Sequence, residues 1–254
     1  NGILPLSSEK GKVKKEKLMV MGPNAADSTM LWGIYFGQAA HTVTPLEGIQ
    51  SRIGNVPYLT ACGITNMTVK EMAIGKAIEN AADGSTTLQM TEKGKHNYTI
   101  EEILEATKKV KTVIFVGGIS PNLEREQARI NEPGFDGGDR TSIELPQVQR
   151  DILKALHKAG KKVIFVCCSG SAVALEPEME SCDAIIEAWY AGEQGGHALA
   201  DVIFGDYNPS GKLPVTFYKN DAQLPPFEEY KMAGRTYRFM HDKPLFPFGY
   251  GLSY

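Results

Sequence analysis

The feature that most constrains the fold is a series of short apolar runs, rich in β-branched residues, spaced along the chain. The runs are apolar on both sides, which is typical of strands buried on both faces of a parallel sheet. Parallel strands need crossover connections, so we expect helices between them. The five runs are LMVMG (18–22), VPYLTA (56–61), TVIFVG (112–117), KVIFVC (162–167) and AIIEAWY (184–190).

Helix signals lie between these runs. Thr44, Thr68 and Thr99 each stand three residues before a glutamate, the capping-box pattern in which a hydroxyl and a carboxylate satisfy backbone donors at a helix N-terminus. The segment 146–159 carries its apolar residues on one stripe and stops at Gly160, as an amphipathic helix does. Strand and helix alternate, which predicts one α/β domain.

The expected architecture is a three-layer α/β/α sandwich whose mostly parallel sheet has about six strands. One of these is an antiparallel edge strand, predicted for LPVTFY (213–218), which follows the turn NPSGK. The polar, glycine-containing stretch 83–96 is interpreted as a surface loop, and 219–235 as an irregular excursion.

Composition excludes several classes of function. Lys and Arg number 27 against 30 Asp and Glu, for a net charge of −3, so the chain lacks the basic surface that nucleic-acid binding needs. No run approaches eighteen apolar residues, and no membrane span is expected. The chain starts without Met, in what reads as the middle of a segment. We therefore interpret it as an excised domain, which leaves room for a targeting signal upstream.

Ligands of open α/β sheets bind outside the carboxyl ends of the strands. The first loop there, Gly-Pro-Asn-Ala, puts Pro23 where a phosphate would need a backbone donor, and no nucleotide-binding glycine motif occurs. The glycines of AGEQGGH (191–197) favour close packing over an anion cradle. Ser169 and Ser171 do not form a Gly-x-Ser-x-Gly elbow.

No cofactor or metal is expected, because no potential ligands are suitably spaced. The histidines are scattered, and no Cys-x-x-Cys spacing occurs, so the cysteines are interpreted as buried free thiols. The residues concerned are His41, His96, His157, His197 and His241, and Cys62, Cys167, Cys168 and Cys182.

The most elaborate loop at this edge is the acidic stretch NLEREQARINEPGFDGGDR (122–140). Its Glu124 and Glu126 allow two interpretations on position alone. They are either part of a solvated charged loop, or one of them is a general acid. In the second case the partner group would come from another domain, because a long loop can reach across the interface between domains. Asp139 and Arg140 are predicted to form an ion pair that ties the end of the loop to the start of the next helix.

Three longer motifs add a family resemblance. The stretches AWYAGEQGGHALADVIFGDYNPSGKLPVTF (188–217), GRTYRFM (234–240) and PLFPFGYGLSY (244–254) resemble the C-terminal α/β sandwich domain of glycoside hydrolase family 3, the β-glucosidases and β-xylosidases. NGILPL and VMGPNA near the start are similar to the opening of that domain. The resemblance covers essentially the whole chain, and the acidic loop is similar to the version in xylosidase-like members.

The resemblance implies a retaining β-glycosidase. In this family a barrel domain, N-terminal to the sandwich, carries the Asp nucleophile, and the sandwich supplies the acid/base Glu from a loop. By its place upstream of the Asp139–Arg140 pair, Glu126 matches that role, with Glu124 as the runner-up; Arg125 and Gln127 depart from the family pattern. The implied partners are the barrel and an oligo- or aryl-β-glycoside; the barrel and the fibronectin-like domain that often follows are absent here.

The resemblance also implies that the parent protein is periplasmic or secreted. The rival interpretation, from another class, is a stand-alone flavodoxin-like module that binds a small molecule or a nucleotide.

Overall fold

The computed structural model describes residues 2–6, 17–33, 37, 39–79, 86–124 and 130–254. Its strands are β1 (Leu18–Met21), β2 (Tyr58–Leu59), β3 (Thr68–Glu79), β4 (Thr86–Asn97), β5 (Thr112–Gly118), β6 (Phe135–Asp136), β7 (Asp139–Arg140), β8 (Lys162–Cys168) and β9 (Ala184–Glu187). Its α-helices are α1 (Pro45–Ile53), α2 (Ile100–Ala106), α3 (Gln147–Lys158), α4 (Glu178–Ser181), α5 (Gly195–Phe204) and α6 (Thr236–Phe239), and two 3₁₀ turns are η2 (Thr29–Trp32) and η3 (Asp221–Gln223).

The five predicted apolar runs form one sheet of five strands in the order β2-β1-β5-β8-β9, in which every neighbouring pair is parallel. The centre of the sheet is β5, whose Thr112 to Gly118 pair with Lys162 to Cys168 of β8. Both strands are buried from their second residue onward. The α/β sandwich expected from the sequence is therefore confirmed.

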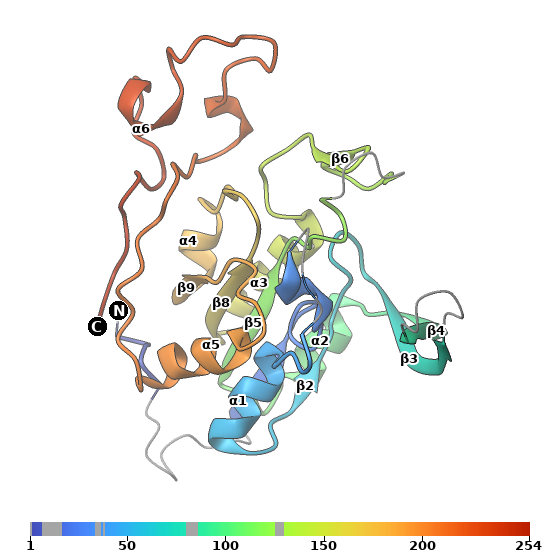
Figure 1. Ribbon diagram of the computed structural model, residues 1–254. Helices are drawn as coiled ribbons and strands as arrows, with labels where there is room; N and C mark the ends of the chain where they lie inside the picture. Colours follow the sequence, from blue (N-terminus) through green and yellow to red (C-terminus); the bar gives the residue numbers. More distant parts are fainter. Residues whose placement is uncertain (1, 7–16, 34–36, 38, 80–85, 125–129) are drawn as a thin grey trace.

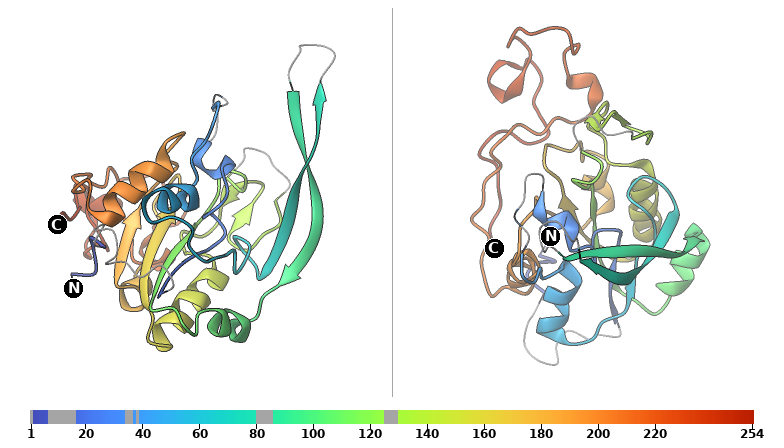
Figure 2. Two further views of the ribbon diagram at one scale, coloured as in Figure 1. Left: turned by 90° about the horizontal axis from the view of Figure 1, so that it is seen from below. Right: turned by 45° about the vertical axis from the view of Figure 1, so that its right-hand side comes forward.

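Helices cover both faces of the sheet (Figures 1 and 2). One face packs against α2 and α3 around Phe115 and Phe165. The other face packs against α1 and α5 around Ile114 and Ile164. Because neighbouring strand residues point to opposite faces, each apolar run contributes to both cores, which explains why these runs do not alternate with polar residues.

Two of the three capping boxes are confirmed. Thr44 caps α1 and Thr99 caps α2, each with the reciprocal glutamate bond to the cap backbone. The box at Thr68 is wrong, and so is the surface loop expected at 83–96, of which 86–96 lie in β4 and 83–85 lie outside the described residues. Thr68 begins β3, which pairs antiparallel with β4 over nearly its whole length. This strand pairing is a non-local interaction that outweighs a local helix signal, and it forms a long hairpin that projects from the body (Figure 2).

The segment 213–218, expected as an antiparallel edge strand, does not join the five-stranded sheet. It lies against the C-terminal stretch instead, through paired backbone bonds between Phe217 and Phe246 and from Leu213 to Tyr250. The excursion predicted at 219–235 is irregular apart from η3, as expected. Asp221 fixes it to the body by accepting from the Ser142 hydroxyl (2.7 Å) and the Ile143 amide (2.8 Å).

The glycines at the start of α5 serve close packing. A Cβ at Gly196 would lie 2.1 Å from the Thr44 carbonyl oxygen, and a Cβ at Gly48 would lie 1.9 Å from the Gly196 carbonyl oxygen. Helices α1 and α5 therefore approach each other where neither has a side chain. This supports the packing interpretation of AGEQGGH over an anion cradle.

Candidate functional site

The loops after β1, β5, β8 and β9 lie at the carboxyl edge of the sheet, where ligands of such folds bind. The first of these loops, after β1, makes its hydrogen bonds within the domain. The buried Asn24 amide donates to the carbonyls of Gly117 (3.1 Å) and Ile119 (3.0 Å), which ties the end of β1 to the end of β5. The Asn24 amide is thereby used within its own domain, and Pro23 offers no backbone donor to a phosphate, so the geometry does not favour the rival flavodoxin-like interpretation.

Glu124, one of the two candidate acid/base residues, lies in the loop that follows β5. The Tyr190 hydroxyl, from beyond β9, donates to Glu124 Oε2 at 2.6 Å, and the Ser171 hydroxyl, from beyond β8, donates to Glu124 Oε1 at 3.3 Å. Three strand ends therefore meet at one carboxylate. Glu126, the preferred candidate, lies outside the described residues.

Arg140 also contacts this cluster, but it does not form the ion pair predicted with Asp139. Its guanidinium donates to the Ser171 hydroxyl (3.1 Å) and the Ala172 carbonyl (3.0 Å), and within the described part of the chain no ion pair joins it to Asp139. The two residues form the short strand β7, which turns back to β6, and neighbouring strand side chains point apart. Burial lowers the pKa of Arg140, and the nearby charge of Glu124 acts in the opposite direction.

Sequence reasoning missed a second carboxylate at the same edge. Glu187 ends β9, and its Oε1 accepts from the Ser169 hydroxyl (3.0 Å) and the Trp189 amide (3.2 Å), while its enclosed Oε2 has no oxygen or nitrogen partner and the Cys167 thiol is nearby. Burial raises the pKa of Glu187 to about 7, against the opposing effect of these two bonds and of the Cys167 thiol. A single acid inside the apolar run AIIEAWY was the signal that could have identified it.

Glu187 should make stability depend on pH. Its pKa is about 7 when folded against an ordinary value of 4.5, so folding takes up a proton between these values, and the free energy of unfolding should fall as pH rises from 4.5 to 7. The contribution is at most about 3 kcal/mol. Urea unfolding of the 254-residue chain across this window should show a shallower pH dependence in Glu187→Gln, whereas the exposed Glu105→Gln should match wild type. Equal slopes in Glu187→Gln and wild type would contradict this assignment.

The cysteines are free thiols, as predicted. Cys62, Cys167 and Cys168 are buried, and Cys182 is half-buried. Burial raises the pKa of all four thiols, that of Cys62 to about 12. Thiols of this kind stay protonated and react poorly, so they contribute packing rather than chemistry.

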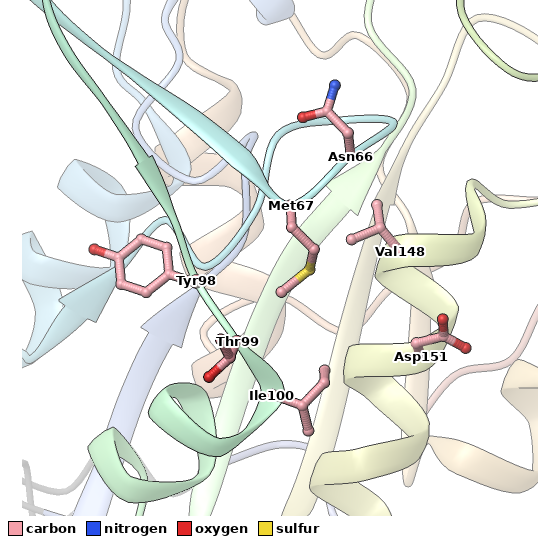
Figure 3. A pocket seen from close by; sticks show the side chains of 7 residues that line it. All are labelled: Asn66, Met67, Tyr98, Thr99, Ile100, Val148 and Asp151. Atoms are coloured by element: carbon pink, nitrogen blue, oxygen red, sulfur yellow. The ribbon is translucent and has the colours of Figure 1, made fainter.

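A pocket of about 500 Å³ lies away from these carboxylates, between the base of the β3–β4 hairpin and the first turns of α2 and α3 (Figure 3). Its one carboxylate, Asp151, accepts from the Gln147 amide at 2.7 Å. Of the site residues that the structure describes, none of Glu124, Arg140 and Glu187 lines it. The lining residues are Asn66, Met67, Tyr98, Thr99, Ile100, Val148 and Asp151.

Fold and site together define an α/β sandwich domain with an acidic loop anchored at its carboxyl edge. The chain matches the glycosyl hydrolase family 3 C-terminal domain over residues 1–254. It is 37% identical to xylan 1,4-β-xylosidase of Xylanibacter ruminicola, over 100% of this chain and 42% of that protein. It is 34% identical to periplasmic β-glucosidase of Salmonella typhimurium, over 95% of this chain and 31% of that protein.

Among solved structures, a family 3 exo-β-xylosidase in complex with a xylobiose aziridine activity-based probe is similar with a TM-score of 0.74 and 26% identity. The match covers 100% of this chain and 29% of that one. The chain therefore belongs to the C-terminal domain family of glycosyl hydrolase family 3. It spans less than half the length of the relatives it matches. In the described part of the chain, no helix is both long and apolar enough to cross a membrane.

Proposed function

We propose that this chain is the sandwich domain of a retaining β-glycosidase that acts on β-xylosides or β-glucosides. It supplies the general acid/base carboxylate to an active site completed by another domain of the same protein. The observation that carries this proposal is the acidic loop, held at the carboxyl edge of a domain that spans less than half of β-xylosidase and β-glucosidase relatives.

The proposed division of labour follows from the retaining mechanism, in which two carboxyl groups about 5 to 5.5 Å apart act on one glycosidic bond. A barrel domain N-terminal to this chain carries an Asp that attacks the anomeric carbon, and the bond to the leaving oxygen breaks as Glu126 protonates that oxygen. Glu126 then takes a proton from water, whose oxygen attacks the same carbon and releases the Asp. A fibronectin-like domain follows this chain in the proposed parent protein.

The contacts of Glu124 support Glu126 as the acid/base. A general acid must present a proton to an oxygen of the substrate. Both carboxylate oxygens of Glu124 instead accept hydrogen bonds from Tyr190 and Ser171 of its own domain. The carboxylate of Glu124 is therefore engaged in contacts within the sandwich domain and is poorly placed to protonate a substrate. Glu126 is the remaining candidate of the pair.

We further propose a periplasmic or secreted location for the parent protein. One relative is named a periplasmic β-glucosidase, and this supports the assignment.

The proposal is tested by assaying the 254-residue chain and the full-length protein on aryl β-xylosides and β-glucosides. The chain alone should stay at the buffer baseline, because general acid help is worth only about 10² to 10⁴-fold and needs a positioned sugar and a nucleophile. The full-length protein should turn over at least one substrate. Robust hydrolysis by the chain alone, abolished by one substitution within it, would place both carboxylates in this domain and contradict the proposal.

A further inference from the structure

The contact between Glu124 and Tyr190 joins two loops that are 66 residues apart in sequence. The 2.6 Å separation between the Tyr190 hydroxyl and Glu124 Oε2 is short, as expected for a hydrogen bond to a charged acceptor. Burial raises the pKa of the Tyr190 hydroxyl, and the Glu124 charge raises it further. Tyr190 therefore remains a proton donor at any pH where a glycosidase operates.

The residues around Tyr190 and Glu124 favour the hydrogen bond between them. Tyr190 packs against the apolar core that lies under α1 and α5, and this packing limits the directions its ring can take. A Cβ at Gly170 would lie 2.9 Å from Tyr190 Cε2 and 3.2 Å from Glu124 Oε2, so glycine leaves room for the contact. Arg140 donates to Ser171, which itself donates to Glu124, and so places a positive charge near the carboxylate.

Trp189, just before Tyr190, has φ of 53°, in the left-handed region that few residues with a side chain adopt. Its amide donates to Glu187, and its ring lies edge-on against Phe217. Trp189 thus packs on one core while Tyr190 packs on the other. Such backbone strain persists only where the surrounding contacts hold the conformation in place. Here it accompanies the turn that directs the Tyr190 hydroxyl toward Glu124.

We infer that Glu124 is a positioning residue: its hydrogen bonds to Tyr190 and Ser171 anchor the start of the acidic loop, two residues before the proposed acid/base Glu126. This inference rests on the proposed function. Two residues of chain span at most about 7 Å, so the two glutamates are close enough in sequence for loss of the Glu124 anchor to affect the acid/base role proposed for Glu126. A misplacement of about 1 Å in an active site is enough to cost on the order of 10²-fold in rate.

The test uses Tyr190→Phe in the full-length protein, which removes the donor and keeps the ring. For glycosides with poor leaving groups, kcat should fall about 10-fold, because a misplaced acid protonates the leaving oxygen less well. Activated aryl glycosides should lose less than 2-fold, and KM should stay within about 2-fold of wild type. The matched control is Tyr58→Phe, which removes a hydroxyl hydrogen-bonded to Thr60. Tyr58 lies in β2, the outer strand on the opposite side of the sheet from β9, so this change should leave hydrolysis of both kinds of substrate unaffected.

Glu124→Gln and Glu124→Ala supply an independent measurement. Their pH profiles of kcat/KM should keep the alkaline limb of the wild-type bell, since the acid/base remains, while Glu126→Ala should lose it. Combining Tyr190→Phe with Glu124→Gln should cost no more than the worse single change, as expected for one shared contact.

Two results would overturn the inference: Tyr190→Phe behaving like Tyr58→Phe on both substrates, or Glu124→Ala losing the alkaline limb, which would make Glu124 itself the acid/base. Failure of the proposed function is seen separately, as an inactive wild-type full-length protein or a Glu126→Ala variant with wild-type kinetics.

Discussion

Replacing Glu126 with alanine in the full-length protein is expected to slow hydrolysis of glycosides with poor leaving groups by about 10² to 10⁴-fold, the usual contribution of general acid–base catalysis. Activated aryl glycosides should form the glycosyl-enzyme at nearly the wild-type rate, because their leaving groups depart without a proton. Steady-state and burst kinetics on a series of aryl glycosides of graded leaving-group pKa measure this difference directly.

Glu124→Ala is the parallel control for this experiment, since it removes a neighbouring carboxylate from the same loop. Its leaving-group dependence should be much weaker than that of Glu126→Ala. If both variants lose activity equally on activated and unactivated substrates, the loop contributes to folding or binding, and the acid/base assignment fails.

The largest expected effect on stability comes from Arg150, in α3. Its Nε donates to Glu178 Oε1 at 2.8 Å and its Nη1 to Glu144 Oε2 at 3.0 Å, and only 1% of the Glu178 side chain is exposed. Arg150→Ala would leave the Glu178 charge buried without its partner, a change that typically costs about 3 to 5 kcal/mol. Urea unfolding of the 254-residue chain at pH 7 should show this loss.

Arg52→Ala is the matched control, because Arg52 pairs with Asp201 and Asp206 at a much more exposed site. Its cost should stay below about 1 kcal/mol. Burial raises the pKa of Glu178 and Arg150 opposes that rise, so removing Arg150 lets Glu178 take up a proton more readily. The loss in Arg150→Ala should therefore be smaller at pH 4 than at pH 7. A loss that matches that of Arg52→Ala, or one that does not vary with pH, would contradict this account.

The core of the fold was predictable because its signals are local and strong. Runs that are apolar on both faces, such as 112–117, can be buried only in a sheet covered on both sides. The capping boxes at Thr44 and Thr99 satisfy backbone donors within the first turn of their own helices. Thr68 carries the same box but begins a strand, because its partner segment 86–97 supplies backbone bonds that the local pattern does not contain.

The site was predictable only in part, for a related reason. Position after a buried strand identified the acidic loop, and the family resemblance singled out Glu126 with Glu124 behind it. The partners of Glu124 come from strands that follow it by many residues, at Ser171 and Tyr190. No spacing rule connects them, because strand order in the sheet, rather than distance along the chain, brings these ends together.

The most direct test of the central claim is the product that the full-length Glu126→Ala variant forms from an activated aryl glycoside in the presence of azide. Azide needs no general base to attack the glycosyl-enzyme, so the variant should regain turnover and release a glycosyl azide of retained β-configuration, identified by NMR and mass spectrometry. Wild type and Glu124→Ala should release the free sugar instead. A glycosyl azide from Glu124→Ala but not from Glu126→Ala, or from neither variant, would contradict the account.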